Sequence, residues 1–199
     1  MVNIKKIAIL GPDGAGKSTI IEKLNLYLNN DKTNVFHFHL KTGVKHKKPK
    51  EPIFRTNVKQ YNLILSILKL IYLLFESYAR DIFYYIKHKS IKNKIYIYDR
   101  HIVEILFDKK RFGYNGPYAL LELFYLMVRK PQKIYVVLAR ADQLVLRKNE
   151  LSDKEAKDIV EHYIQVSSKL NMIIVWNDKD IERLVSKILF ETFNSELNI

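Results

Sequence analysis

Apolar residues follow two patterns that alternate from one end of the chain to the other. Short, mostly apolar runs predict buried β-strands, at 4–10, 35–40, 95–98, 133–138 and 172–176. Longer segments in which apolar residues return every three or four positions predict helices, over 20–28, 61–87, 118–129, 141–148 and 181–193, with one more that begins at Ser152 or Asp153. The alternation predicts a three-layer α/β fold, a parallel sheet of about five strands flanked by helices.

The polar stretch after the first strand, residues 11–19, reads Gly-Pro-Asp-Gly-Ala-Gly-Lys-Ser-Thr. Its spacing matches G-x-x-x-x-G-K-[ST], the pattern of a loop whose backbone N–H groups surround phosphates. Lys17 would reach the outer phosphates, and Ser18 would hold Mg²⁺. An ordinary glycine-rich turn is the alternative, but a strand, this loop and a helix in succession favour nucleotide binding. We therefore expect ATP and Mg²⁺ as cofactors, with a binding set of Gly11, Asp13, Gly14, Ala15, Gly16, Lys17, Ser18 and Thr19.

Asp99 and Arg100 directly follow the third strand, at the edge where open α/β sheets bind ligands. Asp99 suits the Mg²⁺ shell, and Arg100 offers a planar guanidinium to phosphate oxygens. The alternative is that the two side chains only satisfy each other or cap the next helix. On the second strand, His37 and His39 share one face; no third ligand is evident nearby, which favours packing or rim positions over a metal site.

Lys41 and Arg80 are candidates for substrate binding. Lys41 opens the basic segment 41–50, which either grips an anionic acceptor or lipid head groups, or is a solvated run of charge. Arg80 lies in the otherwise apolar segment 61–87, which is predicted to form one or two core helices, and it needs an anionic partner. That partner is either a substrate or Glu76, one helical turn earlier.

Arg111 is a third such candidate, in the basic and aromatic loop 108–117. Its guanidinium could meet a phosphate. Phe112 or Tyr114 in the same loop could stack on a flat ring, or both could seal the core.

Residues 147–155 are expected to form a short lid. Arg140 and Arg147 flank the helix that supports it, and an arginine brought in by lid closure can neutralise charge on a transferred phosphoryl group. A static surface hairpin is the alternative.

Composition narrows the choice of partners and compartment. A chain of 199 residues suits one domain over residues 1–199. The formal net charge of +13 favours anionic partners, but no signature of specific nucleic-acid binding accompanies it. Absent cysteine and a strand that begins almost at once point to a cytoplasmic protein. Lys69 and Glu76 interrupt the segment 61–87, leaving fewer than the roughly 20 apolar residues of a membrane span, and contact with a membrane surface is not favoured.

In the order of its motifs, nearly the whole chain resembles the thymidylate kinase family of nucleoside-monophosphate kinases. The resemblance rests on the loop 11–19 and on Asp99-Arg100-His101, supported by the segment from Pro131 to Leu138 that contains the fourth strand, by the segment 147–150 and by Tyr163. It implies a P-loop kinase fold and ATP- and Mg²⁺-dependent phosphoryl transfer to a nucleoside monophosphate, thymidylate first.

The same resemblance implies roles for single residues. Asp13 would contact the acceptor sugar and Arg100 would position phosphate, while Lys17 and Arg147 complete the catalytic set. Thymidylate kinases are commonly dimers, and the apolar surface of residues 61–86 is a candidate interface for a homodimer.

The sequence also departs from the family on the acceptor side. The Arg-Glu-Pro-Gly-Gly segment after the second strand is replaced by Leu40-Lys41-Thr42-Gly43, and the usual aspartate late in the fourth strand is Val137. The chain therefore looks like a divergent, bacterial thymidylate-kinase-like protein. Two other functions stay open: a kinase for a sugar or another small metabolite, and a nucleotide-binding regulatory or membrane-peripheral protein with weak ATPase activity.

Overall fold

The computed structural model describes residues 4–29, 33–39, 62–148, 151–177 and 180–194. The chain groups into two compact units. The sheet unit consists of Met1–His39, Lys92–His101 and Pro131–Ile199, and the helical unit consists of Leu40–Ile91 and Ile102–Lys130. The single domain over residues 1–199 stays a prediction.

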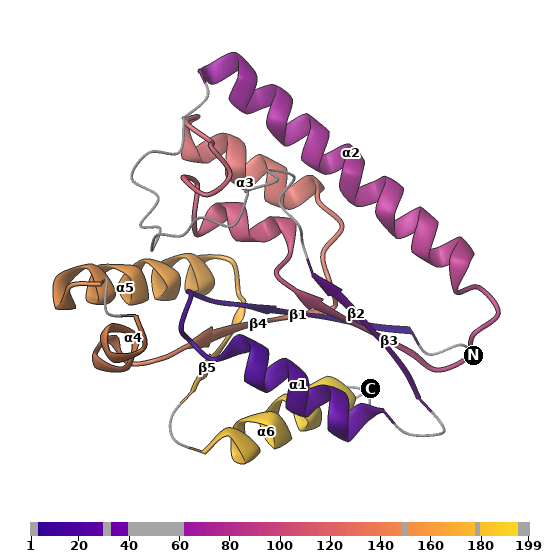
Figure 1. The fold of residues 1–199 in the computed structure, drawn as a ribbon. Helices are drawn as coiled ribbons and strands as arrows, with labels where there is room; N and C mark the ends of the chain where they lie inside the picture. Colours follow the sequence, from indigo (N-terminus) through magenta and orange to yellow (C-terminus); the bar gives the residue numbers. More distant parts are fainter. Residues whose placement is uncertain (1–3, 30–32, 40–61, 149–150, 178–179, 195–199) are drawn as a thin grey trace, which may run out of the picture. The chain divides into compact units, whose positions relative to one another are not determined.

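Five strands of the sheet unit form one parallel sheet in the order β2-β3-β1-β4-β5 (Figure 1). They are β1 (Ile4–Leu10), β2 (Asn34–His39), β3 (Lys94–Asp99), β4 (Lys133–Leu138) and β5 (Ile173–Trp176). The predicted parallel sheet is confirmed. In the pairing of β1 with β3, Ile9 lies opposite Asp99, so the segments that follow these two strands leave the sheet side by side at its carboxyl edge.

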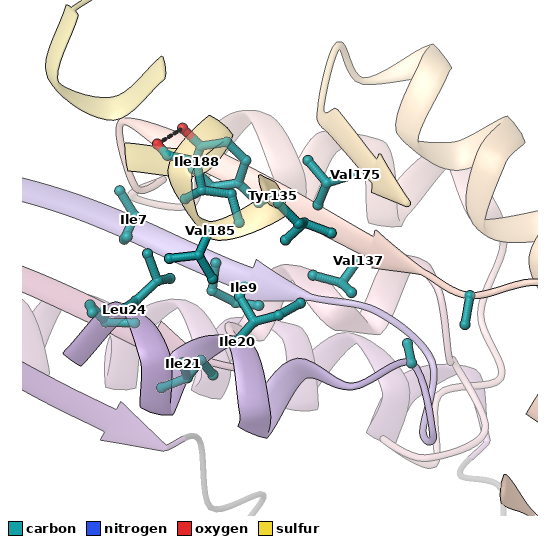
Figure 2. Close-up of a cluster of buried hydrophobic side chains, with 14 of the residues drawn as sticks. Ile7, Ile9, Ile20, Ile21, Leu24, Tyr135, Val137, Val175, Val185 and Ile188 are labelled. Atoms are coloured by element: carbon teal, nitrogen blue, oxygen red, sulfur yellow. Dashed lines mark hydrogen bonds between the residues drawn. The ribbon is translucent and has the colours of Figure 1, made fainter. Parts of the chain in front are cut away.

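The core of the sheet unit lies between the sheet and two helices that contact each other, α1 (Lys17–Leu28) and α6 (Ile181–Asn194). Alternate residues of the central strands supply it, because successive side chains of a strand point to opposite faces. Burial of each large aliphatic side chain contributes roughly 1.5–3 kcal/mol. The core includes Ile7, Ile9, Ile20, Leu24, Tyr135, Val137, Val185 and Ile188 (Figure 2).

A polar contact at the surface also joins α1 to α6. The Glu182 carboxylate pairs with Lys23 and accepts a hydrogen bond of 2.6 Å from the Tyr27 hydroxyl. These two donors, Lys23 first, lower the pKa of Glu182. The remaining helices of the sheet unit are α4 (Ala141–Arg147) and α5 (Asp153–Lys169), which contact each other, and α5 also lies against β4 and β5.

The helical unit contains α2 (Leu63–Lys87), a short 3₁₀ helix, η1 (Ile102–Leu106), and α3 (Tyr118–Met127). Asn62 caps α2, since its side chain accepts a hydrogen bond from the Leu65 N–H at 2.9 Å. The Tyr78 hydroxyl donates to the Met127 carbonyl at 2.8 Å and so ties α2 to α3. The sequence predicts one or two helices over 61–87, and the structure has one; η1 was not predicted.

The expectation that residues 61–87 form a core helix holds for one face of α2 only. Leu70 and Leu73 are buried, whereas Ile64 is 68% and Phe75 is 75% exposed. The helix therefore has a large apolar face in contact with solvent. In the described part of the chain, no helix is both long enough and apolar enough to span a membrane.

Candidate nucleotide site

The loop between β1 and α1 fits its surroundings only because two of its residues are glycines. A Cβ on Gly11 would lie 2.1 Å from the Val137 carbonyl oxygen, and one on Gly16 would lie 2.2 Å from the Asn177 Nδ2. Their φ angles of +143° and +89° are also strained for other residues. The loop is thus packed closely against the end of β4 on one side and against the residue that follows β5 on the other.

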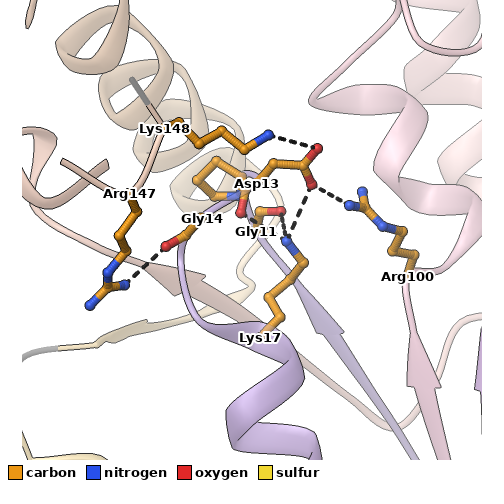
Figure 3. Close-up of polar contacts among 8 residues, drawn as sticks. Gly11, Asp13, Gly14, Lys17, Arg100, Arg147 and Lys148 are labelled. Carbon is orange, nitrogen blue, oxygen red and sulfur yellow. Dashed lines mark hydrogen bonds and ion pairs between the residues drawn. The ribbon is translucent and has the colours of Figure 1, made fainter. Parts of the chain in front are cut away.

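Lys17 is the first residue of α1 and is 7% exposed. Its Nζ donates hydrogen bonds of 2.8 Å to the carbonyl oxygens of Gly11 and Pro12 (Figure 3). The ammonium therefore lies inside the curve of the loop. The first turn of an α-helix leaves its backbone N–H groups without helical partners. The positive charge of Lys17 and the N–H groups at the amino end of α1 therefore lie at the same place, where an anion would be attracted by both.

Asp13 is the centre of the charged contacts in Figure 3. Its Oδ1 pairs with Arg100 and lies 3.8 Å from the Lys17 Nζ, and its Oδ2 lies 3.6 Å from the Lys148 Nζ. One carboxylate thus holds three cationic side chains together. The excess of positive charge favours a polyanionic ligand such as a chain of phosphates.

Arg100 comes from the turn after β3 and has a left-handed backbone, with φ +68°. Such a conformation is uncommon for residues other than glycine. The Arg100 N–H donates to the Ile9 carbonyl at 3.4 Å, and the guanidinium reaches Asp13. Arg100 therefore pairs with a residue of the loop 11–19. The sequence alternative, in which Arg100 and Asp99 only satisfy each other, does not include this contact.

Residues at the end of α4 also reach the loop. Arg147 Nη1 donates to the Gly14 carbonyl at 2.9 Å, next to the contact of Lys148 with Asp13. Two consecutive basic residues thus hold two consecutive loop residues. Arg140, the other arginine that flanks this helix, is exposed and pairs with Asp142 instead.

The predicted lid spans the start of α5. Ser152 and Glu155 form a reciprocal capping box, in which the Ser152 hydroxyl accepts from the Glu155 N–H and the Glu155 carboxylate accepts from the Ser152 N–H. Asn149 and Glu150 lie outside the described residues. The lid itself stays a prediction.

A cavity of about 650 Å³ lies within the sheet unit, next to the cluster around Asp13. Its walls are the loop and first turn of α1, the pair Asp99 and Arg100, and the pair Arg147 and Lys148, together with Asn177 and Ile181. The sequence-derived residues Asp13, Lys17, Ser18, Thr19, Asp99, Arg100 and Arg147 are thus brought together. Asn177 and Lys148 were not predicted as site residues, although a polar residue directly after a strand, at the carboxyl edge of the sheet, is a signal that could have identified Asn177.

A magnesium ion fits the oxygen donors of this cavity. Ser18 and Asp99 both line it, and Mg²⁺ on phosphates usually needs only one or two protein ligands. A binding site made by the protein alone would need three or more metal-ligating side chains, and the described residues contain no such cluster.

Arg80 and Arg111 are not among the described residues that line this cavity. Arg80 lies 4.0 Å from Glu76 on the same helix, which is the local alternative that the sequence left open. Arg111 belongs to the helical unit, where its N–H donates to the Asp108 carboxylate at 2.9 Å. Lys41 lies outside the described residues.

The two aromatic residues of the loop 108–117 are buried. Phe112 and Tyr114 are 4% and 1% exposed, which favours sealing of the core over stacking on a ligand, and burial raises the pKa of Tyr114. His37 is exposed on β2, and no metal cluster includes it among the described residues.

Kinases are among the solved structures that match this fold. The thymidylate kinase of Candida albicans matches with a TM-score of 0.58 and 15% identity over 100% of this chain and 94% of that one. The thymidylate kinase of Ehrlichia chaffeensis gives 0.54 and 15%, over 94% and 97%. Deoxyadenosine kinase from M. mycoides with bound dATP gives 0.53 and 19%, over 94% and 98%.

No family model and no curated protein matches the sequence. The likeness to the solved kinases confirms the predicted P-loop kinase fold and extends the resemblance to thymidylate kinases from motifs to the whole chain fold.

Proposed function

We propose that this protein is an ATP- and Mg²⁺-dependent kinase that transfers a phosphoryl group to a nucleoside monophosphate, with thymidylate as the first candidate acceptor. The observation that carries the proposal is the convergence of Lys17, Arg100 and Lys148 on Asp13 beside the loop amides. A kinase fold with this cluster at the carboxyl edge of its sheet suits phosphoryl transfer, in which positioning and electrostatics dominate.

Each charged residue has a proposed task. Lys17 leaves the loop carbonyls for the outer phosphates of ATP, and Arg147 stabilises negative charge on the transferred group from the lid side. Arg100 binds the phosphate of the acceptor. Asp13 accepts a hydrogen bond from the acceptor sugar, since a carboxylate among phosphate-binding amides is repelled by the donor phosphates and must face elsewhere.

Ser18 and Asp99 are the proposed ligands of Mg²⁺ in this reaction. The ion would supply charge neutralisation between the donor phosphates. Arg80, Arg111 and Lys41 stay candidates for the acceptor side, where the sequence departs from thymidylate kinases.

The test is release of ADP from ATP with a panel of acceptors. Thymidylate should stimulate release over the rate without acceptor, and other nucleoside monophosphates should do so less. The panel includes sugars and, because one solved neighbour is a deoxyadenosine kinase, free nucleosides. If no nucleoside monophosphate stimulates ADP release, the proposal is wrong. If only a sugar or only a nucleoside stimulates it, that class of compound is the acceptor instead.

A second copy of the chain is the proposed partner of the exposed face of α2. Apolar residues on this face are spaced alternately by four and three positions, which is the spacing of helices that pack along their length. They are Ile64, Leu68, Ile71, Phe75, Tyr78, Ile82 and Tyr85, and all are exposed.

The mass of the protein in solution tests this pairing. Phe75→Glu should convert a dimer to a monomer in light scattering after gel filtration. Leu26→Glu is the matched control, because Leu26 on α1 is also 75% exposed and should leave the mass unchanged. A monomeric wild type that co-sediments with anionic liposomes would instead support the membrane-peripheral alternative.

A further inference from the structure

Asn177 is a buried amide that contacts the phosphate loop from the end of the edge strand β5. It follows β5 directly and is 3% exposed. Its Nδ2 donates a hydrogen bond of 2.7 Å to the Ala15 carbonyl oxygen, and its own N–H donates to the Leu138 carbonyl at 2.6 Å. The backbone bond fixes Asn177 to the end of β4, so its side chain is a fixed support for the loop.

The contact determines how one loop peptide is turned. The Ala15–Gly16 peptide is trans, since the structure describes no cis peptide bond, and in a trans peptide the carbonyl and the following N–H point in opposite directions. With the Ala15 carbonyl held by Asn177, the Gly16 N–H points away from Asn177. Within the described part of the chain, the Gly16 N–H has no protein acceptor.

Two further features show that this contact is specific. The amide of Asn177 fills the place that a Cβ on Gly16 would take, so the loop and the amide fit each other closely. The Asn177 Oδ1 is buried with no hydrogen-bond partner among the described residues, which costs free energy. The residue thus keeps an unfavourable acceptor while its donor holds the loop.

We propose that Asn177 is a positioning residue of the nucleotide site, which holds the Ala15–Gly16 peptide so that the Gly16 N–H is presented to a phosphate. The inference rests on the proposed function, because it takes the loop to be a phosphate site. Asn177 acts through the backbone of the loop and not by contact with the base, since its side-chain amide is buried.

The experiment is calorimetric titration with Mg²⁺ and either ATP or tripolyphosphate, a probe that has the phosphates and no base or sugar. Asn177→Ala should weaken both ligands alike, by about tenfold, because a turned peptide costs one hydrogen bond to a charged group. Asn177→Leu, which keeps the branched shape and loses the donor, should do the same. Full affinity in both variants would overturn the inference, and so would a loss for ATP alone, which would mean that Asn177 contacts the nucleoside.

Asn25→Ala is the matched control. Asn25 also has a buried Oδ1 without a partner among the described residues, but lies on α1 away from the loop, so this variant should bind like the wild type. Trp176, the single tryptophan of the chain, precedes Asn177, and unchanged emission from it reports an intact end of β5 in each variant.

The wild type separates the two proposals. If the folded wild type binds neither ATP nor tripolyphosphate, the proposed function fails. If it binds both and the variants bind equally well, only the role of Asn177 fails.

Discussion

Arg100 in the sheet unit and Arg80 in the helical unit are both largely buried arginines that the sequence suggests as substrate-binding candidates. They differ in how far along the sequence their ion-pair partners lie. The Arg100 side chain is 12% exposed and pairs with Asp13, which is 87 positions away. The Arg80 side chain is 19% exposed and pairs with Glu76, one helical turn earlier. The first contact exists only in the folded sheet, whereas the second would form in any helix with this sequence.

The difference shows where chemistry can be inferred from geometry. Arg100 has a left-handed backbone, which persists only where the surrounding structure imposes it, and such outliers are common at ligand sites. Arg80 has an ordinary helical position. The structure therefore supports the proposed binding role of Arg100, whereas the proposal for Arg80 rests only on its unusual setting in the sequence.

The largest effect should come from Lys17, at the centre of the sheet-unit site. Lys17→Ala should reduce kcat by roughly a thousandfold or more, because the positive charge that we propose binds the outer phosphates of ATP is lost. The measurement is ADP release with the best acceptor, alongside circular dichroism to show an intact fold. Lys23→Ala, which removes a lysine of the same helix that pairs with Glu182, should keep full turnover.

Asp13→Ala should separate the two substrates. We expect the KM of the acceptor to rise about tenfold, the value of one hydrogen bond to a charged group. The affinity for ATP should stay equal or improve, since Lys17, Arg100 and Lys148 lose their shared counter-ion. Steady-state kinetics and calorimetry measure the two quantities, and equal damage to both would refute the acceptor role of Asp13.

Local patterns predicted the elements of the sheet unit because the interactions that form them are close in sequence. The strand 133–138 is predicted with both ends correct. A short apolar run is typical of a strand that is buried on both faces of a parallel sheet, and the polar residues on each side of the run mark its ends. Spacing and position at strand ends predicted that the loop 11–19 and Asp99-Arg100 belong to one site, and residues of both line the cavity. Asn177 has its side-chain partner 162 positions away, and no local pattern reports such a contact.

The helical unit was predicted less well for a related reason. The segment 61–87 is apolar on nearly every face, so hydrophobicity alone could not tell which face is buried. The sequence between Ile102 and Leu106 is five buried residues that fit a strand, a helix or a turn equally well. Tertiary contacts decide such segments.

Arg80→Ala tests the helical unit's side of the comparison. If Arg80 binds the acceptor, its loss should raise the acceptor KM severalfold, and Glu76→Gln, which breaks the same ion pair, should leave the KM unchanged. A partly exposed helical pair is worth only about 0.3–0.5 kcal/mol, so both variants should fold. If the acceptor KM is the same in both variants, Arg80 does not bind the acceptor and serves only in the ion pair with Glu76.

The smallest effect should come from the capping box at the start of α5, which lies in the predicted lid. Ser152→Ala should destabilise the protein by about 1 kcal/mol in urea unfolding, the usual value of an N-cap. Hydrogen bonds from the Ser152 side chain and backbone lower the pKa of Glu155 from 4.5. A lowered pKa in the folded state means a contribution that is present above pH 4.5 and is lost as the pH falls through the folded-state value. The stability difference between wild type and Glu155→Gln should therefore shrink on acidification below that pH, and a difference that stays constant down to unfolding would show that the carboxylate does not cap α5 in solution.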